Sequence, residues 1–366
     1  MSRGGSHVSA TEDAPQGSWL LSALEPPSYG MLRDNALYKP TARELFREWA
    51  SHLNLFATRK NWVAAWSWFT SAILVVPLIA FFVYHATFPL FFAGALYGLV
   101  GLGTHGTVYY HRYATHRAFK FRNAFTRFIV KNLMIKLIVE EAYVVSHHVH
   151  HLLSEKPGDP YNVNGGFWYC FLADANHQGV NRDLDERGHT QLTKLLSHTG
   201  VVTNTFAQYQ RWGSIANPAA TVASFALNWI CWYAMWYAIG GNGLATAIFG
   251  GAFVWAFGVR TFNFDGHGAG EDKRRDGIDF NRDDLSINQV WPGYVAGEWH
   301  NNHHLYPNGA RSGFLPYQLD IAWLFIRGYA AIGGVTSYRD PKAQFYRDHY
   351  EPWLAARSDK KAPKSA

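Results

Sequence analysis

Histidine is the residue type in this sequence with the clearest capacity for chemistry. Ten of the 18 histidines among the 366 residues fall in four short groups, and nine of them, all but His148, are the candidate ligands. The groups read His111-Arg-Tyr-Ala-Thr-His116, His147-His-Val-His150-His151, Asn263-Phe-Asp-Gly-His267 and His300-Asn-Asn-His303-His304. Neutral imidazole binds Fe, Zn, Cu and Ni alike, so the residue type predicts a metal site without naming the metal. Nine imidazoles exceed what one ion can hold, and the pattern therefore predicts a binuclear site with four or five histidines for each ion.

The spacing within the groups indicates how the rings are presented. In an HxxHH group the histidines stand at i, i+3 and i+4, and on a helix these positions share one face, so three rings can converge. His111 and His116 are five residues apart, about 140° around an ideal helix. We therefore expect these two to reach different metals or to lie at a helix end. His7, His52, His189, His198 and His349 are more typical of structural or surface histidines, whereas His105, His148 and His177 stay open, with support of ligand rings as one role.

Two long uncharged stretches must position these groups. Residues 61–110 and 212–259 contain no Asp, Glu, Lys or Arg. Each is long enough for two membrane helices of roughly 20 residues with a short turn. We predict four transmembrane helices, near 62–84, 89–109, 221–239 and 244–262, because a soluble protein rarely buries such stretches twice.

Basic residues predict the orientation of these helices. All Lys and Arg lie outside the two hairpins, beginning with Arg59-Lys60, which places both termini and the central segment in the cytoplasm. The histidine groups fall on the same side. Residues 121–145 are too charged to span a membrane and are typical of a helix at the interface or over the spans. The expected fold is an all-α integral membrane protein: two helical hairpins with a cytosolic helical cap that carries the histidines.

The sequence divides into three parts under this interpretation. Residues 1–60 form an N-terminal cytosolic segment whose first ~15 residues we expect to be disordered. Residues 61–350 form the membrane domain, and residues 351–366 form a polar tail. The formal charge of +6 reflects basic residues on one membrane side, and we expect no nucleic acid partner. The two cysteines, Cys170 and Cys231, are too few for a disulfide framework or a four-thiolate site.

The histidine groups, with their flanking residues, resemble the membrane fatty acid desaturase superfamily, in particular its acyl-CoA desaturase-like branch. The resemblance rests on HRYATHRAFKFRN, HHVHHLLSEKPGDPYN, NFDGH and GEWHNNHHLYP, in this order. It implies a pair of iron ions, a hydrophobic tunnel for an acyl chain, O2, and an external electron donor of ferredoxin or cytochrome type. It also implies that Asn263 holds an iron-bound water and that the iron ligands are His111, His116, His147, His150, His151, His267, His300, His303 and His304. Two positions depart from the family pattern: His148 replaces an arginine and Tyr161 replaces a histidine.

A narrower resemblance concerns the substrate. The segments SHHVHHLLSEKPGDPYN, GVRTFNFDGHG and WPGYVAGEWHNNHHLYPNGARSGFLPYQLD are similar to bacterial membrane enzymes that form 1-alkenes from free fatty acids. This implies oxidative decarboxylation of a free medium- or long-chain fatty acid to a terminal 1-alkene and CO2, in a bacterial inner membrane. The alternative is a fatty acyl desaturase that inserts an in-chain double bond.

A free acid needs donors for its carboxylate. Arg112, Arg117 and Arg260 lie beside the histidine groups, and arginine binds carboxylates in bidentate fashion. Each arginine has an equally ordinary alternative, a phospholipid contact or a salt bridge. The segment 270–289, which is not typical of ordinary acyl-CoA desaturases, carries Lys273-Arg274-Arg275, and we interpret it as a solvated loop with balancing acids.

A different class of function is also compatible with histidine clusters. The metal could be zinc in a membrane hydrolase, or a metal carried by a transporter. A catalytic zinc site needs only three protein ligands, fewer than this sequence offers. A transporter is expected to place ionisable residues within its spans, whereas these histidines follow the spans.

Overall fold

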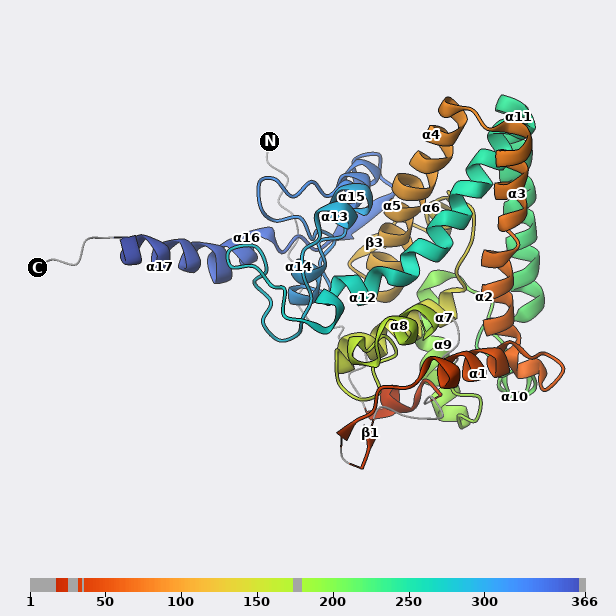
Figure 1. Cartoon of the computed structure of the whole chain (residues 1–366), viewed down its shortest axis with the longest axis horizontal. Coiled ribbons are helices and arrows are strands. Elements are labelled where there is room, and N and C mark those ends of the chain that lie inside the picture. The colour runs from red at the N-terminus through yellow and green to blue at the C-terminus, as the bar shows by residue number, and fades with distance from the viewer. Residues whose placement is uncertain (1–17, 26–31, 35, 174–179, 362–366) are drawn as a thin grey trace, which may run out of the picture.

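The computed structural model describes residues 18–25, 32–34, 36–173 and 180–361 (Figure 1). The N-terminal stretch expected to be disordered and His177 lie outside these residues. The described chain is mostly helical. Its strands form two small antiparallel sheets, which pair β1 (Leu32–Arg33) with β2 (Ala36–Leu37) and β3 (Phe119–Phe121) with β4 (Val335–Tyr338).

Three helices of the described chain are long and apolar enough to cross a membrane: Arg59–His85, Phe88–Thr115 and Pro218–Gly266. The first two cover the predicted ranges 62–84 and 89–109. Their segments are η2 (Arg59–Asn61), α2 (Trp62–Ala72), α3 (Val75–Ala80) and η3 (Phe81–His85), then α4 (Phe88–Leu96), η4 (Tyr97–Leu102), α5 (Gly103–His105) and η5 (Gly106–Thr115).

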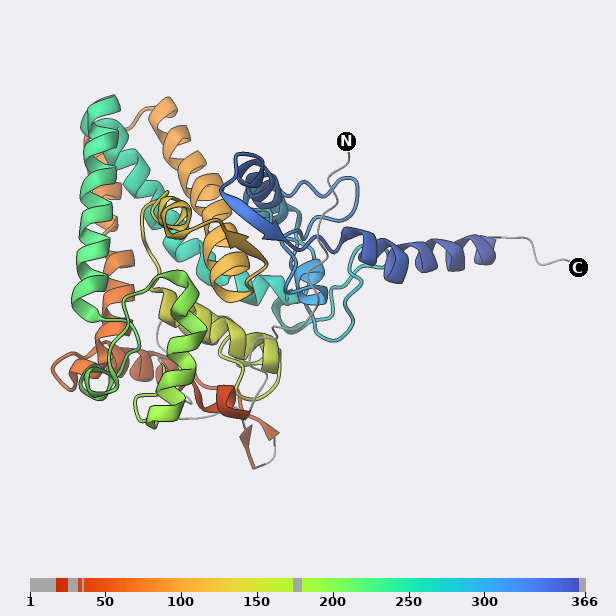
Figure 2. The same ribbon diagram turned by 180° about the vertical axis from the view of Figure 1, so that it is seen from behind.

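The third helix covers both remaining predicted ranges. It comprises α11 (Pro218–Gly258), η8 (Val259–Thr261) and α12 (Phe262–Gly266). Gly240 and Gly241 within α11 have non-helical backbone angles, and Gly241 has a φ of 66°. A residue without Cβ adopts this angle at little cost. The two halves of α11 run in opposite directions from this point, as the green and teal segments of Figure 2 show.

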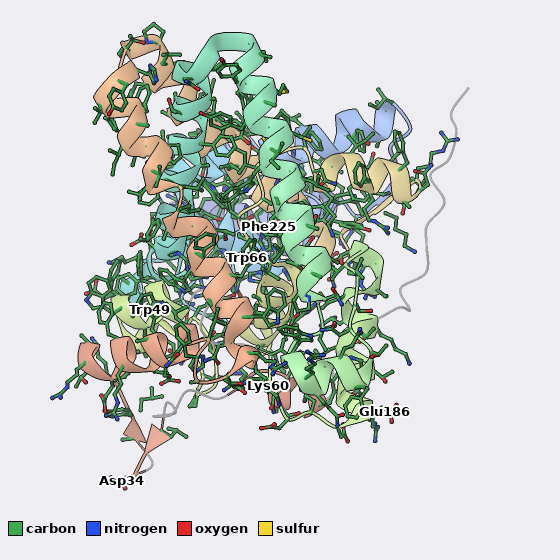
Figure 3. The ribbon with its side chains drawn as sticks, turned by 90° about the vertical axis from the view of Figure 1, so that its right-hand side faces the viewer. Asp34, Trp49, Lys60, Trp66, Glu186 and Phe225 are labelled. Atoms are coloured by element: carbon green, nitrogen blue, oxygen red, sulfur yellow. The ribbon has the colours of Figure 1, made fainter. Side chains whose placement is uncertain are left out.

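Small residues let α4 and η4 approach the second half of α11 until the backbones touch. A Cβ atom built on Gly94 would lie 2.4 Å from the carbonyl oxygen of Ala247, and one on Gly98 would lie 2.5 Å from that of Gly251. Because lipid offers no hydrophobic driving force between helices, such close backbone packing is a main source of their association. Aromatic rings join α2 to the first half of α11, where Trp66 and Phe225 lie edge to face with ring centres 5.9 Å apart (Figure 3).

The chain between the hairpins differs from the single interfacial helix expected over 121–145. It forms β3, α6 (Ala124–Lys131), a non-helical stretch, and then α7 (Glu140–Leu153). Asn123 and Thr126 form a capping box that begins α6. The later α-helices are α8 (Phe167–Ala173), α9 (Glu186–Leu196), α10 (Phe206–Trp212), α13 (Val290–Ala296), α14 (His300–Leu305), α15 (Ile321–Ala331), α16 (Lys342–Phe345) and α17 (Glu351–Lys361).

The two ends of the chain differ in how they contact the body of the molecule, since Leu20, Ala23 and Leu45 of the N-terminal part are buried in the core. The N-terminal part contains η1 (Ser18–Ser22) and α1 (Ala42–Leu53). The segment expected as a polar tail begins as a helix, because residues 351–361 form α17, which projects from the body of the molecule (Figure 1). The remaining short helical turns are η6 (Val163–Gly165), η7 (Ser197–Thr199), η9 (Gly268–Gly270) and η10 (Tyr346–Tyr350).

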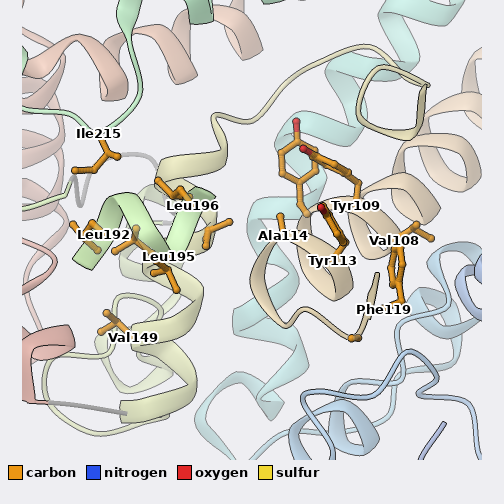
Figure 4. Close-up of a cluster of buried hydrophobic side chains, with 14 of the residues drawn as sticks. Val108, Tyr109, Tyr113, Ala114, Phe119, Val149, Leu192, Leu195, Leu196 and Ile215 are labelled. Atoms are coloured by element: carbon orange, nitrogen blue, oxygen red, sulfur yellow. The ribbon is translucent and has the colours of Figure 1, made fainter. Parts of the chain in front are cut away.

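A buried cluster fastens α9 to the segments that carry the first two histidine groups. Leu192, Leu195 and Leu196 of α9 are buried in the same cluster as Val149 of α7 and Tyr109 of η5 (Figure 4). Side-chain donors also bind the chain just after α9. Tyr109 and Lys131 donate to the carbonyl of Thr199. Tyr113 and Arg127 donate to the carbonyl of His198. Cations at a helix C-terminus are favourable, so this contact holds the histidine-bearing helices in place.

Candidate metal centre

Nine of the ten histidines in the four sequence groups, all but His148, come together in two clusters. We call them the five-histidine group (His111, His116, His147, His151, His303) and the four-histidine group (His150, His267, His300, His304). Within each group the potential ligand atoms lie within 4.8 Å of one another. Seven of the nine residues are buried, and His151 and His304 are partly buried. The predicted gathering of these nine rings is therefore seen in the structure.

A π-helix explains why His111 and His116 belong to the same group. Residues 106–115 form the π-helix η5, and the amide of His116 donates to the carbonyl of His111 at 3.1 Å. This i→i+5 bond sets residues five apart nearly one above the other. The rings of His111 and His116 are 5.1 Å apart. Of the two alternatives expected for this pair, the position at a helix end is the one that the structure shows, for His116, and both residues lie in one cluster.

Each HxxHH group divides its histidines between the two clusters. On α7, His147 and His151 belong to the five-histidine group and His150 to the four-histidine group. On α14, His300 and His304 belong to the four-histidine group, while His303 belongs to the other. Residues at i and i+4 stay together and the residue at i+3 turns to the neighbour, so each helix contributes to both clusters. The three rings of each helix do share one face, as the spacing predicts, and the division into five and four agrees with the four or five histidines expected for each ion.

The nitrogen positions fit a metal ion in each group. Nε2 of His303 lies 2.9 Å from Nε2 of His111 and 3.0 Å from that of His151, and Nε2 of His300 lies 3.1 Å from that of His267. Two ligand nitrogens ~2.1 Å from an ion and at right angles to each other are about 3.0 Å apart. Among the described residues, Nε2 of His116, His150 and His304 is buried without a hydrogen-bond partner, as expected for an atom that faces a cation.

Carboxylates hold the other ring nitrogen of several of these histidines. Nδ1 lies 3.0 Å from Glu298 in His111, 2.9 Å from Asp159 in His150, 2.9 Å from Glu155 in His267 and 2.6 Å from Asp284 in His304. A carboxylate at Nδ1 fixes the tautomer in which Nε2 is free to bind a metal, and it makes the ring a better ligand.

The site keeps most of its rings neutral and its acids charged. Burial lowers the pKa of His116, His147, His151, His300 and His303 well below the usual value, and neighbouring rings add to this effect. For His150, burial is outweighed by Asp159, so its pKa is raised. The pKa of Glu298 and of Asp284 is lowered despite burial, because His111 and His304 respectively stabilise the charged form. Neutral imidazoles beside charged carboxylates are the protonation states that a metal cation requires.

The residues predicted to bind the substrate carboxylate lie in different environments. The guanidinium of Arg112 is buried and forms a bidentate pair with Asp320, at 3.1 and 3.0 Å. Arg117 is exposed and donates to the carbonyls of Lys194 and Leu195. For Arg112 the structure shows the salt bridge of the alternative interpretation, whereas the contacts of Arg117 with backbone carbonyls match neither interpretation.

Arg260 and Asn263 lie on the turns that precede His267. Both are buried, and Arg260 stands 4.0 Å from the ring centre of Trp68 with Nη2 3.4 Å from Oγ of Ser71. Asn263 starts the turn that ends at His267, and its backbone carbonyl accepts a hydrogen bond from the amide of His267 at 3.2 Å. Asn263 belongs to neither histidine group. Its predicted role with an iron-bound water stays a prediction.

Sequence reasoning missed the four carboxylates. The segment 270–289, interpreted as a solvated loop, supplies Asp284 to His304, and the amide of Leu285 donates to Glu155 at 2.6 Å. The acids of this segment do balance its basic residues, as Arg274 pairs with Asp272. The signal was present, since Glu155, Asp159 and Glu298 each lie within nine residues of a histidine group.

Comparison with known proteins agrees with this site. The model of the fatty acid desaturase family matches residues 86–336, which include all nine histidines. Among curated proteins, the chain is 26% identical over 250 residues to the palmitoyl-monogalactosyldiacylglycerol delta-7 desaturase of Arabidopsis thaliana, covering 67% of this chain and 59% of that protein. It is 26% identical over 260 residues to delta-9 acyl-lipid desaturase 1 of the same plant, covering 67% and 73%. It is also 26% identical over 270 residues to the hex-5-enoyl-[acyl-carrier protein] acetylenase of Moorena producens, covering 69% and 78%.

The chain belongs to the fatty acid desaturase family. It is therefore an oxidoreductase of lipid metabolism that associates with a membrane. Its family is iron-dependent, and the structure has two histidine clusters that could bind metal. The zinc hydrolase and metal transporter alternatives lose their support at this point.

Proposed function

We propose that the five-histidine group and the four-histidine group each hold one iron ion, and that the pair uses O2 to oxidise a C–H bond of a fatty chain. The division of nine buried histidines into two groups within ligand distance carries this proposal. The two groups would hold the iron pair, which, when reduced by an external electron donor, would supply the oxidising power needed to remove hydrogen from an unactivated methylene.

The residues of the chain serve this chemistry by position and by exclusion of water. α7 and α14 contribute to both groups, so the two ions share one rigid frame. The carboxylates of Glu155, Asp159, Asp284 and Glu298 fix the rings and offset the charge of the ions. Burial of the rings keeps water away from a reactive intermediate.

For the substrate we propose a free medium- or long-chain fatty acid, which leaves as a terminal 1-alkene and CO2. Sequence resemblance to bacterial 1-alkene-forming enzymes supports this choice. Of the three arginines considered for the carboxylate, Arg260 is the best candidate, because Arg112 is bound to Asp320 and Arg117 is exposed. A second outcome, insertion of an in-chain double bond, has its own support, since several curated relatives are named as desaturases.

The cellular setting completes the proposal. The two halves of α11 on either side of Gly240–Gly241 would make the third and fourth of four membrane crossings. Both termini and the histidine groups would then face the cytoplasm, where the basic residues lie, as expected for a bacterial inner-membrane protein. Electrons would come from a separate ferredoxin- or cytochrome-type protein.

Two measurements test these points separately. Metal analysis of protein purified after iron-replete expression should find about two irons per chain, as nine ligands in two groups imply; zinc alone would contradict the metal assignment. Membranes supplied with lauric acid, O2 and a reductant should release undecene, detected in the headspace by mass spectrometry. An unsaturated C12 acid without undecene would exclude decarboxylation and retain the desaturase.

A further inference from the structure

Large apolar side chains remain exposed on one side of the segment that leads into α14. Trp291 and Tyr294 of α13 are 62% and 38% exposed, and Tyr317, Leu319 and Leu324 are 47%, 49% and 54% exposed. We call these five residues the α13 patch. They come from two parts of the chain that hydrogen bonds join, since the hydroxyl of Tyr294 donates to the carbonyl of Tyr317 at 3.0 Å. Exposed apolar clusters of this kind indicate a partner.

The chain around the α13 patch is almost free of charge. Residues 285–297 contain no Asp, Glu, Lys or Arg, and residues 312–326 contain only Asp320. Asp320 is buried and bound to Arg112, so it presents no charge to the outside. The guanidinium carbons of Arg311 and Arg327 lie 5.8 and 5.7 Å from the ring centre of Trp323, which is itself buried. Trp291, in contrast, is exposed in a segment without charges, and such a tryptophan is typical of the boundary between lipid and water.

Contacts with the second long helix place α13 at membrane depth. Oγ1 of Thr104 donates to the carbonyl of Val295 at 3.3 Å, and a Cβ atom on Gly103 would lie 3.2 Å from that of Ala296. Thr104 follows Phe88, the start of this helix, by 16 residues, or about 24 Å along the axis. The hydrocarbon core is about 30 Å thick. A helix that touches Thr104 thus lies at or within the edge of the bilayer, and Figure 1 shows α13 beside α5.

We infer that the α13 patch is seated in the bilayer, at the boundary between acyl chains and headgroups, as a membrane contact additional to the long helices. Lipid accounts for the patch better than a protein partner does, because α13 packs against the second long helix, the surrounding chain carries almost no charge, and the patch carries aromatic rings with polar tips. Trp299 links it to the metal centre: its indole Nε1 donates to the carbonyl of Leu319 at 3.0 Å, and His300 is the next residue. The fourth histidine group, His300–His304, therefore stands on a base that lipid contacts.

Spin labels on single cysteines test this inference. The background is Cys231→Ser, since the other cysteine, Cys170, is buried. Three variants, Trp291→Cys, Leu319→Cys and Tyr317→Cys, each provide one cysteine in the α13 patch for the spin label. Ile230→Cys on α11, 64% exposed among apolar residues, is the lipid control, and Glu186→Cys on α9 is the water control.

The readout is the collision of each label with O2, which concentrates in lipid, and with a water-soluble nickel chelate, in liposomes of phosphatidylethanolamine and phosphatidylglycerol. The three patch positions should give an O2-to-nickel ratio several times that of Glu186→Cys and close to that of Ile230→Cys. A ratio like that of Glu186→Cys would overturn the inference, as would labels that neither reagent reaches, because these would indicate coverage by a second copy of the chain. The measurement needs no iron, so its result is independent of the proposed reaction.

Discussion

The two histidine groups differ in what stands behind their rings. In the four-histidine group, Nδ1 of His150, His267 and His304 each lies within 3.0 Å of a carboxylate, and that of His300 lies 3.8 Å from Glu298. In the five-histidine group, only His111 has such a partner, again Glu298. One group has more rings and the other has more charge.

This difference indicates that the two groups would bind an ion by different means. Carboxylates that accept from Nδ1 raise the basicity of a ligand ring and hold its orientation. The five-histidine group lacks most of these supports and instead offers one more nitrogen. We expect the ion in the four-histidine group to be held more tightly, because its net environment is more negative, and the ion in the five-histidine group to be the first removed by a chelator.

Adjacent residues on α7 allow the sharpest test. His150→Ala removes a ligand from the four-histidine group, and His151→Ala removes one from the five-histidine group. Each variant should retain about one of two irons and lose product formation by more than the ~10–100-fold typical of a lost supporting residue. Iron per chain by mass spectrometry, with Mössbauer spectra of the remaining ion, should show that the two variants lose different ions.

The neighbouring His148→Ala serves as the control for changes on this helix, since His148 belongs to neither group. If His150→Ala and His151→Ala gave the same Mössbauer spectrum, the division of α7 between two sites would be incorrect.

Loss of a carboxylate should have the next largest effect, confined to one group. Oδ2 of Asp284 faces His304, while Oδ1 accepts from Asn281 at 2.8 Å and from the amide of Ser286 at 3.0 Å. Asn has only one acceptor oxygen, so Asp284→Asn turns an amide N–H toward a donor. We expect the affinity of the four-histidine group for iron to fall ~10–100-fold, measured as release to a chelator. The exposed neighbour variant Asp283→Asn should release iron as the unchanged protein does.

Glu298 contacts both groups but unequally, so its replacement should have a smaller effect. Its Oε2 lies 3.0 Å from Nδ1 of His111, and its Oε1 lies 3.8 Å from Nδ1 of His300. In Glu298→Gln the remaining oxygen can still accept from His111, and only the longer contact is lost. Iron affinity should fall at most about tenfold. A loss larger than that of Asp284→Asn would show that the shared carboxylate matters through its charge on both ions.

Much of this comparison could be predicted from the sequence, and the rest could not for definite reasons. Histidine spacing and two uncharged stretches gave the nine residues of the site and the positions of the long helices, because helical periodicity and lipid exclude most alternatives. The assignment of His111 and His116 to one group depends on a π-helix, which periodicity does not reveal. The division of α7 and α14 between the groups depends on how these helices meet in space.

The carboxylates were missed for another reason. Acids are common near any charged loop, and nothing in the spacing of Asp284 distinguishes it from its neighbour Asp283. Only the fold brings the segment 270–289 back to α14, and this places Asp284, rather than Asp283, against His304.

A buried acid without a histidine partner provides the last contrast. The carboxylates of Glu298 and Asp284 are held charged, whereas Glu141, at the other end of α7, is buried against the amide of Ala216, from which Oε2 accepts at 2.6 Å. Burial raises the pKa of Glu141 to about 7, although the backbone donors oppose it. The folded protein therefore keeps a proton that the unfolded chain releases near pH 4.5. Because the folded state binds more protons between these values, the stability contributed by this group falls as pH rises from about 4.5 to about 7.

Glu141→Gln should remove this dependence and leave the iron content unchanged. The raised pKa of Glu141 corresponds to a change of roughly 3 kcal/mol, as an upper limit, in the free energy of unfolding over that pH range. Thermal unfolding in detergent at pH 5 and pH 7.5 should show a smaller difference for the variant than for the unchanged protein. Glu140→Gln is the matched control: the pKa of Glu140 is lowered, since Lys131 and Lys136 outweigh burial. Glu140→Gln removes the charge that pairs with Lys131. The Glu140→Gln variant should therefore be destabilised at neutral pH instead. Equal pH profiles for the unchanged protein and Glu141→Gln would show that Glu141 is charged in the fold, like the acids that face the histidines.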